Sequence, residues 1–323
     1  MNIKSFIVVL CSIPIFHQID AKEIDTTVMV SVGGIEQFIS IKGREASNPI
    51  LLYLHGGPGA AVSSHREQVT GHLENHFVVV HWDQRGSGRT QKLNKGSLTP
   101  SMARMKQDAE EMLVYVLQLF ERKQLILLGN SWGSILGFHL AQTYPDKVQS
   151  FIAVSPIINH FKSQRLALAA LKVHFNKKQN EKALAQLGSV SIPISNANQM
   201  LILHRWETVF NGSDFSDEKF VQYLNYFKEW EKHWMPLYNE FYNLDLINQI
   251  TRIDCPLYIL QGDRDLTSHY KIAQSFFEKV EAPKKELMWL ENSGHNIPGT
   301  NPSIMQKLIL MVLKKQSRTE ESK

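Results

Sequence analysis

Cysteine is nearly absent from this chain of 323 residues, which contains only Cys11 and Cys255. If Cys11 is removed with the N-terminal segment, only Cys255 remains and no disulfide can form within the mature chain, so the cysteine count neither supports nor opposes an oxidising compartment. Paired histidines or cysteines at metal-ligand spacing are also lacking, and the sequence predicts neither a metal nor any other cofactor.

An excess of one charge is lacking as well. Lys and Arg number 35 against 31 Asp and Glu, a net charge of +4, and the basic residues are scattered along the chain. Proteins that bind nucleic acid gather basic residues in a stripe or tail, so nucleic acid is excluded as a partner. Hydrophobic residues make up 43% of the chain, which is enough for a substantial core and excludes a disordered protein.

Long apolar runs of membrane-spanning length are missing too. The N-terminal run, residues 6–16, follows Lys4, contains Pro14 and gives way to polar residues before Ala21. This layout is typical of a signal peptide. We predict that residues 1–21 are removed on export to the periplasm or the outside, and that no membrane span remains. A buried or amphipathic first helix is the other interpretation of this segment.

What the sequence does contain is an alternation of apolar runs and stretches with helical spacing. The runs, typical of strands buried on both faces, lie at residues 28–32, 38–41, 50–54, 77–82, 125–128, 151–154, 257–260 and 287–290. Helical spacing marks residues 100–120, 134–144 and 304–314. Such alternation predicts an α/β fold with a mostly parallel sheet flanked by helices. We assign residues 22–156 and 251–316 to this core and residues 317–323 to a frayed tail.

The middle of the chain, residues 157–250, differs from both halves of the core. It shows no clear strand, helical spacing predominates, and aromatic residues are crowded into it. We predict that this segment is a helical cap inserted into the core. Most of its aromatic side chains serve packing of the cap.

A candidate nucleophile follows one of the predicted strands. Residues 129–133 read Gly-Asn-Ser-Trp-Gly, a G-x-S-x-G pattern between the run 125–128 and a predicted helix. A nucleophilic serine needs this strand-turn-helix context, because the flanking glycines let the backbone bend sharply and leave the hydroxyl uncovered. The sequence therefore indicates Ser131 as the nucleophile of a serine hydrolase.

A serine hydroxyl needs a base to take its proton and an acid to orient that base. In this fold class the two partners follow the serine in the order acid, then histidine, at the ends of later strands. Asp263 and Asp265 follow the run 257–260, and His295 follows the run 287–290. We predict His295 as the base and prefer Asp265 as the acid, with Asp263 pairing with Arg264 or capping the turn.

Backbone N–H groups must also stabilise the oxyanion that forms during acyl transfer. Residues 55–59, His-Gly-Gly-Pro-Gly, follow the run 50–54 directly, where this fold class builds such a donor. We predict an oxyanion hole formed by the N–H groups of Gly57 and Trp132. A plain tight turn would show the same glycines and proline.

Taken together these motifs resemble the proline iminopeptidase family of the α/β-hydrolases. The resemblance also rests on Asp-Gln-Arg-Gly-Ser-Gly at residues 83–88, and it spans about residues 28–310. It implies release of an N-terminal residue, often proline, from short peptides through an acyl-enzyme and without a metal. It further implies the triad Ser131, Asp265 and His295, with Asp83 and Arg85 bracing loops. The chain departs from the family at Asn130, where glycine is common.

An aminopeptidase must bind the α-ammonium of its substrate, and a buried cation needs a carboxylate partner. Trp206-Glu207 resembles the family's Trp-Glu pair, and Glu231 resembles its second acidic site, so both glutamates are candidate substrate-binding residues. A solvated helix position is the alternative for each. The resemblance favours an aminopeptidase acting on small peptides; a carboxylesterase for small acyl esters and a non-catalytic binding protein remain open. The oligomeric state is not indicated.

Overall fold

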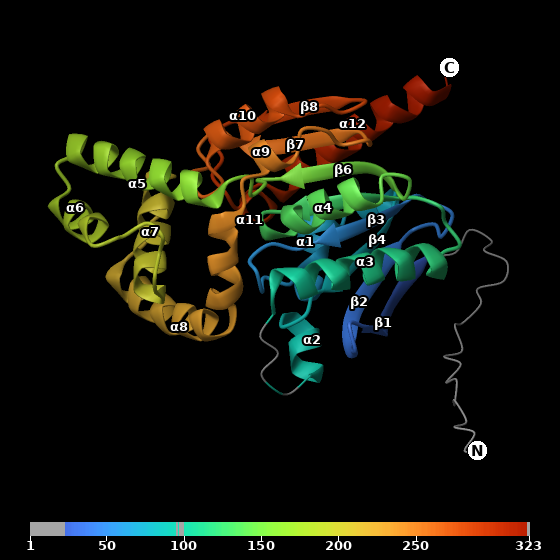
Figure 1. The fold of residues 1–323 in the computed structure, drawn as a ribbon, viewed down its shortest axis with the longest axis horizontal. Helices are drawn as coiled ribbons and strands as arrows, with labels where there is room; N and C mark the ends of the chain where they lie inside the picture. Colours follow the sequence, from blue (N-terminus) through green and yellow to red (C-terminus); the bar gives the residue numbers. More distant parts are fainter. Residues whose placement is uncertain (1–22, 95, 97–99, 322–323) are drawn as a thin grey trace, which may run out of the picture.

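A computed structural model describes residues 23–94, 96 and 100–321 of the chain (Figure 1). The predicted signal peptide, residues 1–21, lies outside the described residues, so export stays a prediction. Within the described ranges, every helix is too short or too polar to cross a membrane.

Eight strands form one sheet in the order β1-β2-β4-β3-β5-β6-β7-β8. They are β1 (Ile24–Val32), β2 (Ile35–Gly43), β3 (Ile50–Leu54), β4 (Val78–Asp83), β5 (Leu125–Asn130), β6 (Val148–Val154), β7 (Leu257–Gly262) and β8 (Lys285–Leu290). The β1–β2 and β2–β4 pairs are antiparallel, and all other neighbours are parallel. The predicted α/β fold with a mostly parallel sheet is confirmed.

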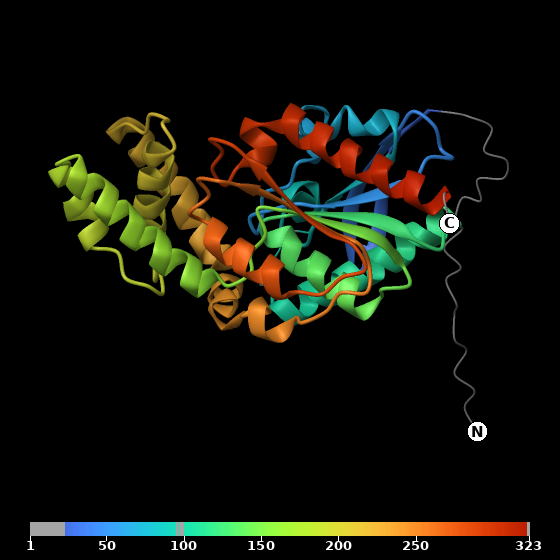
Figure 2. The same cartoon turned by 90° about the horizontal axis from the view of Figure 1, so that it is seen from above.

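Helices cover both faces of the sheet (Figure 2). They are α1 (Arg66–Thr70), α2 (Gly88–Leu93), α3 (Met102–Leu119), α4 (Trp132–Thr143), α10 (Tyr270–Lys279), α11 (Ile297–Thr300) and α12 (Pro302–Glu321). Alternate side chains of a strand point to opposite faces. Leu52 of β3 accordingly packs in the apolar cluster with α3, α4 and α10, whereas Leu51 packs in the cluster with α1 and α12. The central strands β3, β4 and β7 are buried along their whole length, which explains why they read as continuous apolar runs.

A group of helices, which we call the helical insertion, separates β6 from β7. It comprises α5 (His160–Lys177), α6 (Glu181–Gly188), α7 (Ala197–Phe210), α8 (Asp217–Glu240), the 3-10 turn η3 (Phe241–Asn243) and α9 (Leu246–Gln249). Helices α5 to α8 project from one end of the sheet in both views (Figures 1 and 2). Part of the insertion has its own apolar cluster, which includes Leu171, Leu187 and Trp206. The carboxyl ends of the parallel strands therefore face helices that follow β6.

Two helices differ in length from the sequence-based expectation. Helix α4 begins at Trp132, directly after the candidate nucleophile, rather than at residue 134. Helix α12 continues to Glu321, into the segment predicted to be a frayed tail. Apolar side chains of its first turns, such as Met305 and Ile309, are fully buried and anchor the helix. The Lys, Gln, Arg and Glu residues that follow are good helix formers and extend it.

Candidate active site

Ser131 occupies the sharp turn between β5 and α4. Its φ of 49° lies in the left-handed region, which non-glycine residues seldom adopt and which is common where function requires a strained turn. Glycine at position 133 lets α4 pack tightly against the end of β3, because a Cβ there would collide with the carbonyl oxygen of Leu54. The glycines of the motif therefore allow α4 to approach the strand ends closely, and Ser131 lies at the carboxyl edge of the sheet.

The structure brings the three predicted triad residues together. His295 Nε2 lies 2.9 Å from Ser131 Oγ, and His295 Nδ1 lies 3.0 Å and 3.2 Å from the two carboxylate oxygens of Asp265. His295 can thus accept the serine proton at Nε2 while its Nδ1–H faces the acid, which is the geometry of a charge-stabilised base.

The carboxylate of Asp265 is fully buried and held from several sides. It accepts hydrogen bonds from Ser268 N at 2.9 Å and Gln261 Nε2 at 2.9 Å, in addition to the His295 contact. Asp263 lies in the same turn, but its carboxylate accepts from Ser293 N at 3.1 Å. Asp263 is therefore a turn residue, and the preference for Asp265 as the acid agrees with this geometry.

The electrostatic environment favours protonation of His295. Burial lowers the pKa of the imidazole, but the charge of Asp265, the hydrogen bond to it and the charge of Glu207 together raise the pKa above its ordinary value. A raised pKa strengthens His295 as a general base once it is deprotonated. The loop that carries it is tied to β6 by Ser155 Oγ, which donates to the His295 carbonyl at 3.0 Å.

The two predicted oxyanion donors belong to the first turn of α4 and to the loop of residues 55–59. Trp132 is the first residue of α4, so its N–H belongs to the first turn, whose amides have no partner inside the helix. Gly57 has a φ of 114°, which only glycine adopts readily. The neighbouring Gly56 lies so close to the elbow that a Cβ there would be 3.4 Å from Ser131 Cβ and 2.8 Å from Asn130 Nδ2. The loop 55–59 is thus packed directly on the nucleophile turn.

A buried set of hydrogen bonds joins this loop to α4. Gln84 N donates to His55 Nε2 at 3.2 Å, and His55 Nδ1 lies 2.8 Å from the Gly56 carbonyl. The side chain of Gln84 accepts from Trp132 Nε1 at 2.8 Å. Burial lowers the pKa of His55, so the neutral ring acts as a structural link between the loop and Trp132.

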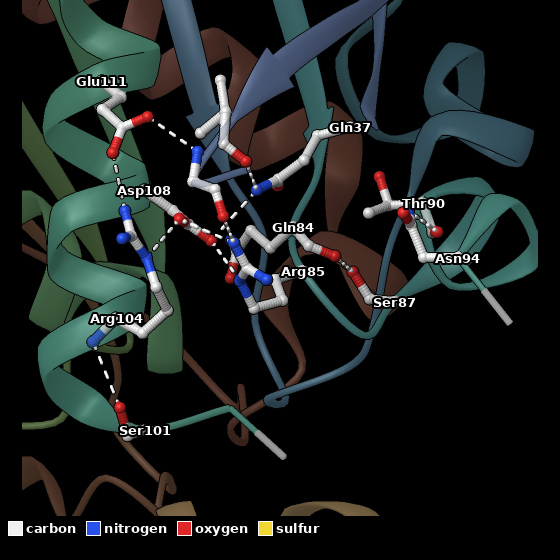
Figure 3. A network of polar contacts seen from close by, with 12 residues as sticks. Gln37, Gln84, Arg85, Ser87, Thr90, Asn94, Ser101, Arg104, Asp108 and Glu111 are labelled. Atoms are coloured by element: carbon white, nitrogen blue, oxygen red, sulfur yellow. Dashed lines mark hydrogen bonds and ion pairs between the residues drawn. The ribbon is translucent and has the colours of Figure 1, made fainter. Parts of the chain in front are cut away.

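Arg85 anchors the loop that follows β4 (Figure 3). Its guanidinium contacts the buried carboxylate of Asp108 on α3, with Nε 2.6 Å from Oδ2. Arg104 Nε lies 2.7 Å from the other oxygen of Asp108, and Gln37 Nε2 donates to the same carboxylate at 3.0 Å. The bracing role expected for Arg85 agrees with these contacts, which tie the loop after β4 to α3 and β2.

Glu207 of α7 lies beside the triad and is 7% exposed. Its Oε2 accepts from Thr267 Oγ1 at 2.6 Å, whereas Oε1 is buried and has no hydrogen-bond partner among the described residues. Burial raises the pKa of this carboxyl to about 7, opposed by the Thr267 hydrogen bond and assisted by the charge of Asp265. A buried carboxylate oxygen without a partner can bind a cation.

The structure places Glu231 elsewhere. Its Oε2 accepts from the backbone N of Ala197, the first residue of α7, at 2.8 Å. Ala197 and Glu207 are separated by nearly three helical turns, about 15 Å along the axis. A carboxylate at a helix N-terminus stabilises that helix. The two predicted substrate-binding glutamates therefore do not converge on one group, and the contacts of Glu231 are structural.

Sequence reasoning missed two polar side chains that lie near the triad. Thr267 stands two positions after Asp265 and binds Glu207, and that proximity in sequence was the only available signal. His160, at the start of α5, is buried and hydrogen-bonded to Tyr238. Nothing in the sequence separates it from the other histidines, because its position depends on how the insertion packs. Among the described residues, acidic, His and Cys side chains are nowhere grouped to hold a metal.

The sheet with its flanking helices and the Ser131–His295–Asp265 arrangement define a hydrolase. Residues 49–302 match the family described as alpha/beta hydrolase fold, and the chain belongs to this family.

Individual relatives share about a quarter or less of their residues with this chain. The chain is 27% identical over 305 residues to the probable aminopeptidase YbaC of Bacillus subtilis, covering 88% of this chain and 95% of that protein. Among solved structures, a proline iminopeptidase-related protein of Thermus thermophilus is 24% identical with a TM-score of 0.54, covering 88% and 96% of the two chains. The proline iminopeptidase of Mycobacterium smegmatis is 16% identical with a TM-score of 0.65, covering 91% and 100%. At these identities the structural likenesses show the shared fold.

Proposed function

We propose that this protein is a serine hydrolase that releases N-terminal residues from short peptides through an acyl-enzyme intermediate. The hydrogen-bonded series Ser131–His295–Asp265, with distances of 2.9 Å and 3.0 Å, is the observation that carries the mechanism. The likeness to a probable aminopeptidase over nearly the whole chain supports the choice of substrate.

In the proposed reaction, Ser131 Oγ attacks the carbonyl carbon of the first peptide bond while His295 Nε2 takes the hydroxyl proton. The N–H groups of Trp132 and Gly57 stabilise the oxyanion, each worth about 3 kcal/mol. His295 then gives its proton to the leaving amine as the C–N bond breaks, which leaves the aminoacyl ester on Ser131. Water, deprotonated by His295, hydrolyses this ester and restores the serine.

Glu207 is the proposed anchor for the substrate's ammonium group. Its carboxylate is buried and lacks a cationic partner among the described residues, and one of its oxygens has no hydrogen bond. An ammonium ion would satisfy that oxygen and hold the carboxylate in its charged form. The charge of Glu207 contributes to the raised pKa of His295, which supports an anchor near the scissile bond.

The proposal is tested with chromogenic amides of proline and alanine and with short acyl esters, assayed on the wild type and on Ser131→Ala. We expect turnover of the free-amine amides and of the esters, and loss of both in the variant by at least about 10⁴-fold. Ester turnover without amide turnover would contradict the peptidase assignment and favour a carboxylesterase. Full activity of Ser131→Ala would contradict the mechanism.

Glu207→Gln tests the anchor. We expect KM for free-amine substrates to rise about 10- to 100-fold, because the ion pair is lost, with little change for N-blocked esters. Glu231→Gln is the comparison, since Gln can still accept from Ala197 N. Equal effects of Glu207→Gln on both substrate types would contradict the anchor, and a selective KM effect of Glu231→Gln would assign that residue to binding instead.

A further inference from the structure

Five polar groups of the helical insertion form a continuous chain of hydrogen bonds beside the active site. Ile194 N donates to Tyr242 OH at 2.8 Å, and Tyr242 OH donates to Gln164 Oε1 at 2.7 Å. Gln164 Nε2 donates to Tyr238 OH at 2.6 Å, and Tyr238 OH lies 2.7 Å from His160 Nε2. The chain thus runs from a backbone amide to an imidazole.

The direction of the chain follows from its first member together with the orientation of the Gln164 amide. A backbone N–H can only donate, so the Tyr242 oxygen accepts from Ile194 and its own proton goes to Gln164 Oε1. The amide nitrogen of Gln164 then faces Tyr238 and donates to it. Tyr238 in turn has its own proton available, and the oxygen of Tyr242 lies nearby as well as His160 Nε2. Because Tyr242 already accepts from Ile194 N, we infer that His160 Nε2 accepts the Tyr238 proton. The opposite orientation of the Gln164 amide would deprive the Tyr242 hydroxyl proton of this acceptor.

The direction of this chain determines whether the other ring nitrogen of His160, Nδ1, carries a proton. An imidazole that accepts at Nε2 and is neutral carries its proton on Nδ1. Burial lowers the pKa of His160 to about 3, with a contribution from the charge of His295, so the ring is neutral at physiological pH. His160 Nδ1 is buried and has no hydrogen-bond partner among the described residues. A buried N–H donor without an acceptor costs about 1–3 kcal/mol.

The position of His160 connects it to the proposed acyl site. Its ring packs edge-on against Phe241, with centroids 5.8 Å apart. Phe241 in turn stacks on Trp132, the residue after the nucleophile, at 4.9 Å and an interplanar angle of 6°. Tyr238, the hydrogen-bond partner of His160, lies near enough to Glu207 for that carboxylate to raise the pKa of its phenol. His160 is therefore linked to Trp132 through Phe241 and to the surroundings of Glu207 through Tyr238.

We propose that His160 is a specificity-determining residue whose Nδ1–H donates a hydrogen bond to an acceptor atom in the acyl part of the substrate. The proposal rests on the proposed serine-hydrolase function. Tyr238, the partner of His160, lies near Glu207. Groups around an ammonium anchor are close to the acyl part of the substrate, because the ammonium and the side chain of an aminoacyl group both branch from the carbon next to the scissile carbonyl. Nδ1 is closed off from solvent, so the acceptor reaches it after side chains of the insertion shift, as commonly happens on binding.

The protonation state is tested first, by ¹⁵N NMR of the full-length protein labelled at histidine. We expect a ring signal with the pattern of a neutral Nδ1–H tautomer that disappears in His160→Gln. A Nε2–H tautomer, or a protonated ring at neutral pH, would overturn the proposal. This measurement uses the wild type and does not depend on any activity.

The specificity is tested with two esters of equal shape, p-nitrophenyl butyrate and p-nitrophenyl methoxyacetate. The ether oxygen of the second replaces a methylene group with an acceptor. After correction for their rates of alkaline hydrolysis, we expect the ratio of kcat/KM, methoxyacetate over butyrate, to fall about 5-fold in His160→Gln, which corresponds to one hydrogen bond. Gln reaches the position of Nε2 and can still accept from Tyr238, but it has no donor at the Nδ1 position.

Two further variants separate specificity from stability. Tyr238→Phe keeps the aromatic ring but breaks the hydrogen-bond chain. His160 is then no longer held in the Nδ1–H tautomer, and the ratio of kcat/KM, methoxyacetate over butyrate, should fall. His174→Gln changes a histidine at the other end of α5 and should leave the ratio unchanged. Equal losses on both esters in His160→Gln would overturn the proposal. If the wild type hydrolyses these esters but no aminoacyl amide, the peptidase function fails while the role of His160 is still decided by the ester ratio.

Discussion

Asp263 and Asp265 stand two positions apart in one turn, yet only Asp265 contacts His295. The difference lies in their surroundings. Asp265 is fully buried and receives hydrogen bonds from Gln261 and Ser268 in addition to His295, whereas Asp263 is exposed and binds a backbone amide of the His295 loop. In this turn the carboxylate of Asp265 contacts the imidazole of His295, whereas the carboxylate of Asp263 stabilises the turn itself.

Asp265→Asn should lower kcat for an ester substrate by about 10⁴-fold with little change in KM, because an amide no longer holds His295 in the tautomer that accepts the serine proton. The matched control is Asp263→Asn, whose side-chain oxygen can still accept from Ser293 N. We expect that variant to stay within a few-fold of the wild type, as for one weakened surface hydrogen bond. Steady-state kinetics on both variants checks the assignment, and similar losses in the two would contradict it.

The pH dependence of ester hydrolysis should report the raised pKa of His295. The free enzyme needs this imidazole neutral, so kcat/KM falls as the pH drops through its pKa, and that limb should lie above the ordinary histidine value. In Glu207→Gln a negative charge that favours the imidazolium is removed. The pKa should therefore decrease and the acid limb should move to lower pH.

An ester without an amino group is used for this profile, so that loss of the ammonium anchor does not enter. Glu229→Gln, which removes an exposed carboxylate of α8, should leave the profile in place. A limb that moves to higher pH in Glu207→Gln, or one that moves equally in both variants, would contradict the described electrostatics.

At the scale of helices and strands, the sequence predicts the position of those site residues that follow directly after a strand of the sheet. Parallel strands end at one edge, so Ser131, Asp265 and His295, each placed after an apolar run, could be assigned to one site without any coordinates. The partners of the insertion could not be assigned in this way. Helical spacing marks a buried face but does not say which helix it meets, so the contacts of Glu207 with Thr267 and of Glu231 with α7 became visible only in the folded chain.

The nucleophile elbow offers a test of packing between elements. Gly133→Ala should lower the free energy of unfolding by about 1–3 kcal/mol, as for other overpacked sites, because the new methyl group would collide with the end of β3. Ester activity should fall with it, since α4 carries Trp132. Gly188→Ala is the control: no atom lies within 4 Å of a Cβ there, and alanine is the better helix former. Urea unfolding of both variants decides the matter, and a Gly133→Ala protein as stable as the control would contradict the packing argument.

For the whole molecule, the helical insertion reaches the oxyanion loop directly. Trp230 Nε1 of α8 donates to the Pro58 carbonyl at 2.9 Å. One turn further along α8, the indole of Trp234 covers Gly59 of the same loop so closely that a Cβ would lie 2.7 Å from its Nε1. A shift of α8 would therefore move Gly57, which directly precedes Pro58 in the loop.

Trp230→Phe removes this hydrogen bond but keeps an aromatic ring against Tyr238, which Trp230 meets edge-on at 5.3 Å. If α8 holds the oxyanion loop in place, kcat should fall about 5- to 10-fold with a smaller change in KM, because a misplaced oxyanion donor weakens the transition state more than substrate binding. Tyr226→Phe, an equally conservative change at an exposed position of the same helix, should leave kcat unchanged. Kinetics combined with thermal unfolding distinguishes the alternatives: a lower Tm with unaltered kcat would mean that the contact only stabilises the packing of the insertion on the core, and that the loop keeps its shape without α8.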